Sequence, residues 1–125
     1  MTSRESKSIV FKSDRCIGCY SCVVSCMDQN DLDVARDDLS WRIVENVPGR
    51  LVGKHRGNAS VSIACMHCED AVCIAACPAG AITRDAATGS VLVDDGLCIG
   101  CHACAMACPF GAPRFWSSGK MKKCD

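Results

Sequence analysis

The chain has 125 residues, enough for one small domain, and its 14 basic residues are balanced by 14 acidic residues. The basic residues are scattered along the chain, which argues against nucleic-acid binding. No run of 18 apolar residues occurs, so we expect no direct membrane insertion. Residues 1–8 contain neither a twin arginine nor an apolar signal-peptide core, so the sequence by itself predicts a cytoplasmic location.

Cysteine is the most informative residue type, with 13 copies in the chain. Such a fraction is typical of small secreted proteins stapled by disulfides. The odd count, the missing signal peptide and the tight runs with spacings of three and four disfavour that class. Structural zinc is a closer alternative because zinc sites also use Cys-x2-Cys pairs. Zinc sites, however, combine two separated pairs, whereas here four cysteines form one run that ends in proline.

The first cysteine run follows a short β-like stretch at residues 8–11. It has ferredoxin spacing, x2, x2 and x3, and its members are Cys16, Cys19, Cys22 and Cys26. Methionine rather than proline follows the last cysteine of this run. We therefore expect the segment Ser21 to Gln29 to continue as a helix of about two turns.

An insert separates the first run from the rest. Residues 28–38 contain five aspartates and few apolar residues, which indicates a solvated loop, with an electrostatic docking patch as the alternative. Residues 40–47 alternate as in a β-strand, and Pro48-Gly49 marks a turn before a return strand that starts at residues 51–52. A further strand at residues 61–64 runs into the second cysteine run.

The second and third runs have nearly the same form. The third run follows the bacterial ferredoxin pattern for a [4Fe–4S] cluster, Cys98-x2-Cys101-x2-Cys104-x3-Cys108-Pro109. The second run differs by two extra residues between its second and third cysteines, Cys65-x2-Cys68-x4-Cys73-x3-Cys77-Pro78. Both continue as Cys-Pro-x-Gly-Ala, in which proline ends a short helix and Gly80 or Gly111 allows a close turn.

The spacing predicts how the two clusters exchange ligands. Three cysteines in one loop can reach three corners of a cubane, whereas the fourth lies one helical turn on and points away, towards the neighbouring cluster. One cluster then takes Cys65, Cys68, Cys73 and Cys108. The other takes Cys98, Cys101, Cys104 and Cys77. Every ligand is then a cysteine, so we expect His67 and His102 not to bind metal.

The remaining pattern predicts an α+β, ferredoxin-like fold with a two-cluster [4Fe–4S] core, short helices and small antiparallel β-hairpins. Short helices are expected at residues 71–76 and 101–108, and a hairpin at residues 81–84 and 90–93, with Gly89 in its turn. We expect one ferredoxin-type domain over residues 1–125. Its parts are the first run and insert (1–64), the two-cluster core (65–113) and a C-terminal stretch (114–125).

The chain resembles the four-cluster iron–sulfur subunits of the dimethyl sulfoxide reductase, polysulfide reductase and formate dehydrogenase family. The resemblance is carried by CIGCYSC, CMHCEDAVCIAACPAGAI, VDDGLCIGCHACAMACPFGAP and the final Lys123-Cys124-Asp125. In that family, a Lys-Cys-Asp of this kind opens a fourth run, which exchanges ligands with the first. The resemblance implies an incomplete site at Cys16, Cys19 and Cys22, and another at Cys26 and Cys124. It favours a sequence cut inside the fourth motif, with up to four clusters in a full-length chain.

The resemblance implies a non-catalytic subunit that relays electrons through [4Fe–4S] clusters. Its partners would be a molybdopterin catalytic subunit and a membrane anchor subunit that handles quinone or quinol, so the chain would be membrane-associated through partners. The alternative is a free soluble multi-cluster ferredoxin that serves several redox partners, and a third class is an iron–sulfur sensor or maturation factor. The insert, residues 28–64, argues against the free ferredoxin, because a minimal carrier does not need it.

Overall fold

The computed structural model describes residues 7–36, 38–48, 59–115 and 117–125. The described residues form a small α+β fold of short helices and three separate two-stranded antiparallel sheets, which confirms the predicted class. The α-helices are α1 (Ser21–Gln29), α2 (Val72–Ala76) and α3 (Ala103–Ala107), and short 3-10 turns cover Ser13–Arg15 and Val34–Arg36. The strands are β1 (Ile43–Val47), β2 (Ala59–Ile63), β3 (Ile82–Arg84), β4 (Val91–Val93), β5 (Arg114–Phe115) and β6 (Met121–Lys122).

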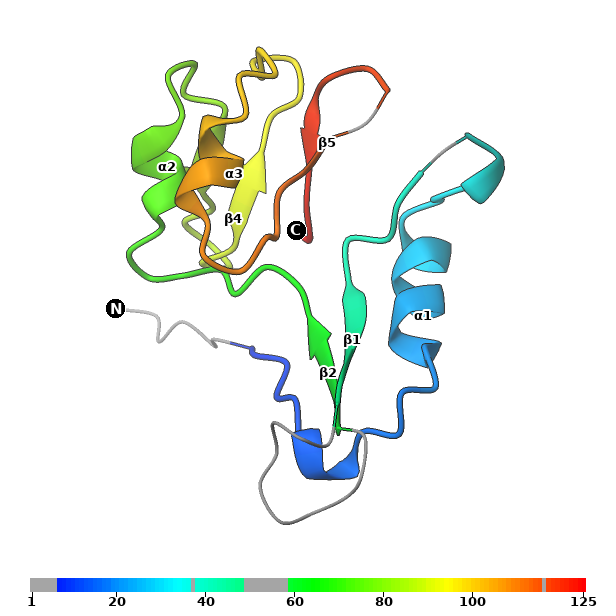
Figure 1. The fold of residues 1–125 in the computed structure, drawn as a ribbon. Coiled ribbons are helices and arrows are strands. Elements are labelled where there is room, and N and C mark those ends of the chain that lie inside the picture. The colour runs from blue at the N-terminus through cyan, green and yellow to red at the C-terminus, as the bar shows by residue number, and fades with distance from the viewer. Residues whose placement is uncertain (1–6, 37, 49–58, 116) are drawn as a thin grey trace.

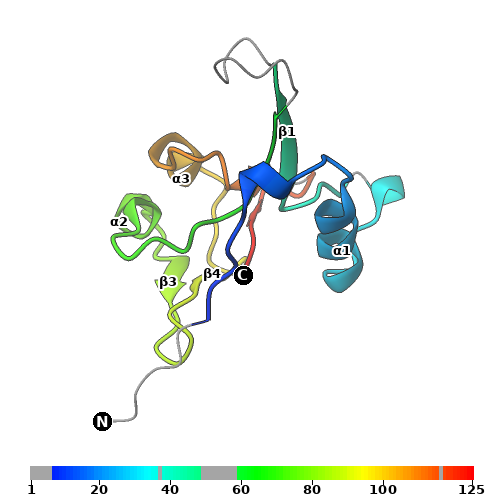
Figure 2. The same cartoon turned by 90° about the horizontal axis from the view of Figure 1, so that it is seen from below.

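The two short helices lie on one side of the molecule and the long helix on the other. Figures 1 and 2 both show α2 and α3 next to each other on the side of the β3–β4 hairpin, whereas α1 lies beyond the β1–β2 hairpin. The β5–β6 hairpin lies between these two halves (Figure 1). Among the described residues, no helix is both long and apolar enough to cross a bilayer.

The buried core is small and belongs to the half that carries α2 and α3. Its buried members are Ile82 of β3, Val91 of β4, Cys104 of α3 and Met121 of β6. A core of four such side chains removes little apolar surface from water, so bound metal would supply much of the folding free energy. The partly buried side chains that pack against it include three more cysteines, together with apolar neighbours: Cys73, Cys77, Cys98, Ile74 and Phe115.

The β3–β4 hairpin confirms its sequence prediction. Ile82 pairs with Val93 and Arg84 with Val91. Asp85 organises the turn, because its carboxylate accepts hydrogen bonds from the Thr88 hydroxyl at 2.6 Å and the Thr88 N–H at 3.1 Å. Gly89 has φ +78°, which is the left-handed backbone that favours glycine at this turn.

The β1–β2 hairpin differs in part from the prediction. The strand expected at residues 40–47 begins only at Ile43, and its partner is β2, which begins two residues earlier than expected. The return strand predicted at residues 51–52 lies outside the described residues. The β-like stretch at residues 8–11 is not a strand, because no described strand pairs with it and its side chains are exposed, Ile9 by 84%.

Candidate functional site

The loop of the third run turns sharply because two of its residues have a left-handed backbone conformation. Gly100 has φ +70° and His102 has φ +64°, which turns the chain between consecutive cysteines before α3 begins at Ala103. Gly100 needs to be glycine for a second reason, since a Cβ there would lie 2.4 Å from the Gly119 carbonyl oxygen. The C-terminal hairpin therefore packs directly onto the cysteine loop.

Four cysteines from two different runs line one cavity. Cys98, Cys101 and Cys104 come from the third run, and Cys77 comes from the end of α2 in the second. The rest of the wall is largely apolar and comes from β3, β4 and the C-terminal hairpin, with Ile82, Val93, Phe115 and Met121. One thiol for each corner and walls that exclude water fit a [4Fe–4S] cluster. The structure thus brings together the four residues that the spacing argument groups.

The Cys-Pro-x-Gly-Ala turn prepares the Cys77 thiol for ligation. The Ala81 N–H donates to Cys77 Sγ at 3.3 Å, and Gly80 has φ +63°, which aims successive amides at the sulfur. Burial acts to raise the pKa of Cys77. Hydrogen bonds from backbone N–H groups outweigh this effect and lower the pKa; they come from Ala81, Ala79, Ile82 and Gly80. The pKa of Cys77 therefore lies below its ordinary value, which favours the thiolate that binds metal.

The C-terminal hairpin completes the third-run site in a way that the sequence pattern did not indicate. The Met121 N–H donates to Cys98 Sγ at 3.4 Å. The Phe115 ring stacks on His102, with ring centroids 3.6 Å apart and 13° between the planes. Cys104 is 7% exposed, and burial, followed by the neighbouring Cys98 and Cys101, raises the pKa of its thiol. His102 thus packs at the cavity wall.

The second-run site is partly assembled around Cys65 and Cys73. The His67 N–H donates to Cys65 Sγ at 3.4 Å. Burial raises the pKa of Cys73, and the nearby Cys65 raises it further. Cys68 is half-buried, and the predicted fourth ligand, Cys108, follows the last residue of α3 as Cys77 follows α2. The helices α2 and α3 pack against each other, and Cys77, directly after α2, lies with the third-run cysteines at one cavity.

Two side chains fasten the second-run loop to the β3–β4 hairpin. The Arg84 guanidinium donates to the Cys68 carbonyl oxygen, to the Glu69 carbonyl oxygen at 2.7 Å and to the Gly89 carbonyl oxygen at 2.8 Å. His67 Nδ1 accepts a hydrogen bond from the Val91 N–H at 3.0 Å. His67 therefore acts as a structural acceptor beside the cysteine loop.

The first-run loop repeats the third-run backbone in a polar setting. Gly18 has φ +70° and Tyr20 has φ +63°, after which α1 runs from Ser21 to Gln29 and confirms the predicted longer helix. Cys19 and Cys22 are exposed, whereas Cys16 and Cys26 are half-buried. Cys22 Sγ lies 3.3 Å from the Ser62 hydroxyl oxygen on β2.

Cys124 lies near cysteines of both the first and the second run. Burial raises the pKa of its thiol, followed by contributions from Cys65 and, more weakly, from Cys26. Asn30 Nδ2 donates to the Cys26 carbonyl oxygen at 2.8 Å and lies 3.8 Å from Cys26 Sγ. Within the described ranges, no group of three His, Cys, Asp or Glu side chains is arranged around a single ion. A four-iron cluster takes one thiolate per iron, so its ligands do not converge on one point.

Two family models match the cysteine-bearing segments. Residues 59–125 match the 4Fe-4S dicluster domain, and residues 13–27 match a 4Fe-4S binding domain. The chain belongs to the 4Fe-4S dicluster family. The dicluster match covers the second and third runs together with Cys124, and the separate match covers the first run.

Curated relatives confirm the resemblance to the iron–sulfur subunits of the dimethyl sulfoxide reductase and formate dehydrogenase family. The chain is 39% identical over 121 residues to the B subunit of the anaerobic dimethyl sulfoxide reductase of Escherichia coli, which covers 90% of this chain and 57% of the relative. It is 46% identical over 105 residues to the formate dehydrogenase iron-sulfur subunit of Wolinella succinogenes, covering 84% of this chain and 49% of the relative. The chain thus spans about half the length of these relatives.

Proposed function

We propose that this chain is an electron-transfer subunit that relays electrons through [4Fe–4S] clusters between a molybdopterin catalytic subunit and a membrane subunit linked to quinone or quinol. The cavity lined by Cys77, Cys98, Cys101 and Cys104 carries the proposal, because its donors match the cluster that the spacing predicts. The relatives named as subunits of an anaerobic dimethyl sulfoxide reductase and of a formate dehydrogenase support the choice of partners. In such a complex the chain is non-catalytic and membrane-associated through its partners.

The ligand assignment is part of the proposal. One cluster takes Cys98, Cys101, Cys104 and Cys77, and the other takes Cys65, Cys68, Cys73 and Cys108. The packing of α2 against α3 supports the exchange of the last cysteine of each run. Cys16, Cys19 and Cys22 belong to a third site, and Cys26 and Cys124 to a fourth, which the nearness of Cys26 to Cys124 supports.

The protein groups have three tasks at each cluster. Clusters of this type, when bound, supply reversible single-electron transfer. The thiols of the run provide the ligands, backbone N–H groups such as those of Met121 and Ala81 donate to ligand sulfurs, and Phe115 and Ile82 keep water away. Hydrogen bonds to sulfur and burial are the means by which a protein sets a cluster potential.

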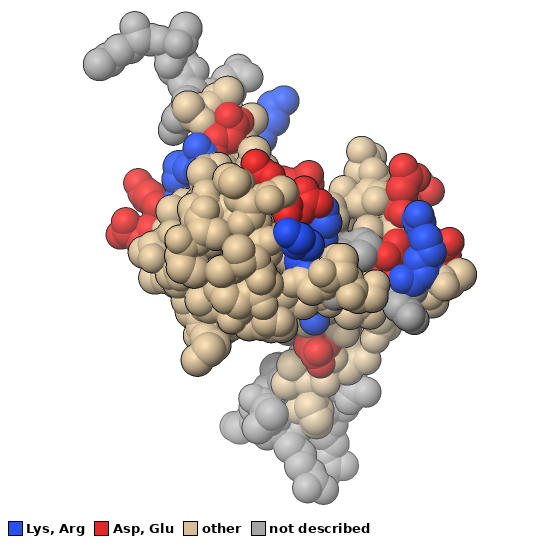
Figure 3. All heavy atoms as spheres, turned by 90° about the horizontal axis from the view of Figure 1, so that it is seen from above, with Lys and Arg blue, Asp and Glu red and all other residues tan. Residues whose placement is uncertain are grey.

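The surface over α2 and α3 supports association with another subunit. Residues 97–113 contain no Lys, Arg, Asp or Glu, and Figure 3 shows a broad uncharged face on the side of these helices with charges at its rim. Within this stretch, Ile99 is 67% exposed and Met106 is 88% exposed. Exposed apolar side chains in a part of the surface without charge are typical of an interface.

Metal analysis tests the presence of the clusters. Anaerobic reconstitution of the chain should give about eight iron and eight sulfide from the two complete sites, because eight cysteines supply four thiolates to each. Iron and sulfide are measured together with zinc on the same sample. Zinc in place of iron, or iron near zero, would contradict the proposal.

Serine variants test the exchange of ligands. Cys101→Ser and Cys68→Ser serve as reference variants, because each removes a ligand from the cluster of its own run under either assignment. Cys77→Ser should reproduce the electron paramagnetic resonance changes of Cys101→Ser, and Cys108→Ser should reproduce those of Cys68→Ser. The opposite pairing of spectra would show that each run holds its own cluster.

A further inference from the structure

The strand β6 and its flanking residues place three lysines at different distances from the two cysteine sites. The local sequence is Lys120-Met121-Lys122-Lys123. Met121 is buried, lines the cavity of the third run and donates its N–H to Cys98 Sγ. The lysines on either side of it therefore lie beside the cluster ligands, but their environments differ.

Lys123 is a buried cation that is not paired with a carboxylate of the described residues. Its side chain is 5% exposed, and Nζ donates to the Val91 carbonyl oxygen and to the Cys124 carbonyl oxygen at 2.8 Å. Across the part of the chain that the structure describes, the ion pairs involve other residues. Removing an ammonium from water is costly unless an opposite charge compensates for it. Lys123 thus needs a source of negative charge in the interior.

The groups near Lys123 that can supply negative charge are cysteine thiolates and, at the surface, Asp125. Val91 accepts from Lys123 through its carbonyl and donates to His67 Nδ1 through its N–H, so the ammonium lies beside the second-run loop. Burial and Cys65 raise the pKa of Cys73 and of Cys124, and the Lys123 ammonium opposes part of this rise at both thiols. The exposed Asp125 is a further acidic group on this side, since it acts on the pKa of His67 in the opposite sense to Lys123.

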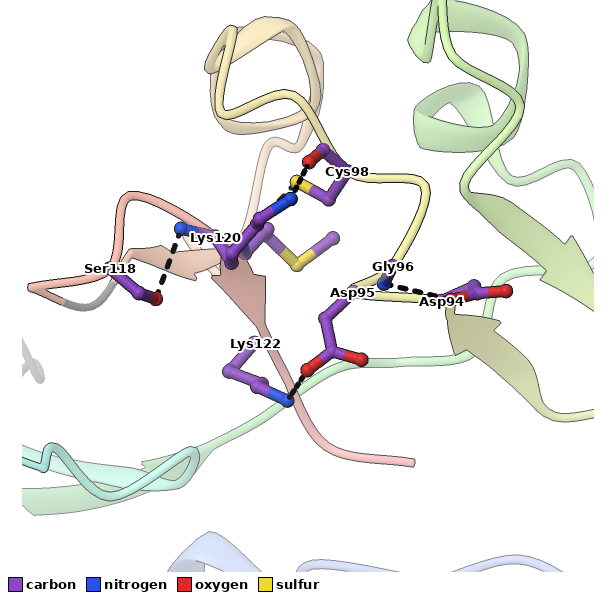
Figure 4. Close-up of polar contacts among 8 residues, drawn as sticks. Asp94, Asp95, Gly96, Cys98, Ser118, Lys120 and Lys122 are labelled. Carbon is purple, nitrogen blue, oxygen red and sulfur yellow. Dashed lines mark hydrogen bonds and ion pairs between the residues drawn. The ribbon is translucent and has the colours of Figure 1, made fainter.

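The other two lysines provide internal comparisons (Figure 4). Lys120 Nζ donates to the Cys98 carbonyl oxygen at 2.5 Å, so its charge lies at the third-run loop. Lys122 Nζ forms an ion pair with Asp95 at 2.6 Å, and both side chains are partly or largely exposed. The charge of Lys122 is therefore compensated and screened by solvent.

We propose that Lys123 sets the reduction potential of the cluster bound by Cys65, Cys68 and Cys73, and that Lys120 does the same for the cluster bound by Cys98. The proposal rests on the proposed function, because it requires bound clusters. Reduction adds one negative charge to a cluster, so a fixed cation nearby stabilises the reduced form more than the oxidised form. A buried cation is more effective than an exposed one, because less solvent screens it.

Redox titration of the reconstituted chain, followed by electron paramagnetic resonance, tests the proposal. Lys123→Met should make reduction of one cluster about tenfold less favourable, which corresponds to about 59 mV for a one-electron couple. The affected wave should be the one that Cys68→Ser perturbs. Lys120→Met should lower the midpoint potential of the other cluster, the one that Cys101→Ser perturbs. Lys122→Met is the matched control and should leave the midpoint potentials of both clusters unchanged. Lys123→Arg keeps the positive charge, so the midpoint potential should stay close to that of the unmodified chain.

Several outcomes would overturn the proposal. Lys123→Met with both clusters present and neither wave shifted would do so, as would a shift of the same wave by Lys120→Met and Lys123→Met. Lys123→Gln guards against a folding effect, because its amide still donates hydrogen bonds without a charge. Loss of iron in both neutral variants, with retention in Lys123→Arg, would assign the lysine to assembly rather than to the potential. Iron near zero in the unmodified chain would instead contradict the proposed function.

Discussion

The loops of the first and third runs have the same backbone but different surroundings. Gly18 and Gly100 both have φ +70°, and Tyr20 and His102 differ by one degree, at +63° and +64°. Each loop leads directly into a helix: α1 carries Cys22 and Cys26, whereas α3 carries Cys104 and ends directly before Cys108. The turn is therefore a local property of the Cys-Ile-Gly-Cys sequence and its spacing.

The environments of the two loops have little in common. The third-run loop faces Met121 and Phe115, and its helix buries Cys104. The first-run loop faces serines, since Cys22 lies beside Ser62 and Gly18 packs against Ser60, and α1 has no buried residue. The comparison teaches that a cysteine run encodes the shape of its loop, whereas the polarity around the site depends on what packs against it.

Removing the apolar wall should destabilise the third-run half most strongly. Met121→Ala is expected to lower the free energy of unfolding by about 2–5 kcal/mol, because Met121 is 1% exposed in a small core. Val24→Ala on the exposed side of α1, where the side chain is 63% exposed, is the first-run control and should cost well under about 1 kcal/mol. Denaturant unfolding of the reconstituted protein measures both, and equal losses would contradict the contrast.

Replacing the equivalent glycines of the two loops by alanine should separate the cost of positive φ from the cost of crowding by the added Cβ. Both Gly100→Ala and Gly18→Ala place a side chain at positive φ, which costs about 1–2 kcal/mol. Gly100→Ala should cost more, because its Cβ would meet the Gly119 carbonyl oxygen at 2.4 Å, whereas that of Gly18 would meet the movable Ser60 hydroxyl at 2.7 Å.

Denaturant unfolding compares the two alanine variants, and adding Ser60→Gly should relieve part of the cost only in the first-run loop. A larger loss of unfolding free energy for Gly18→Ala than for Gly100→Ala would show that the two loops do not differ in this way.

Thiol reactivity with pH should distinguish the two loops by a smaller effect. Hydrogen bonding with Ser21, through its side chain first and then its backbone, lowers the pKa of the exposed Cys19, whereas burial raises the pKa of Cys104. Because the thiolate is the nucleophile, alkylation of Cys19 in the metal-free protein should reach half of its maximal rate below about pH 8.5, the ordinary thiol pKa. Alkylation of Cys104 should still increase above it.

Mass spectrometry of alkylated peptides over a range of pH gives the two profiles. Matching profiles for Cys19 and Cys104 would show that their environments do not differ in the metal-free protein.

The sequence alone predicted the elements that depend on neighbours in the chain. The helix Ser21–Gln29 follows from the absence of proline after Cys26, and the short α2 and α3 end where Pro78 and Pro109 follow a cysteine. The β3–β4 hairpin follows from alternation around a turn with Gly89. Residues 8–11 show the limit of this reasoning, because an apolar stretch becomes a strand only where another strand offers hydrogen bonds.

Only the tertiary structure decided what surrounds the cysteines. Spacing grouped Cys77 with the third run, but it gave no sign that Met121 and Phe115 close that cavity or that His102 stacks on Phe115. Lys123 looked like one lysine among several near the C-terminus, yet it is buried against Val91 while Lys122 pairs with Asp95 at the surface. These contacts join residues far apart in the chain, and local periodicity contains no information about which distant side chain will fill a given space.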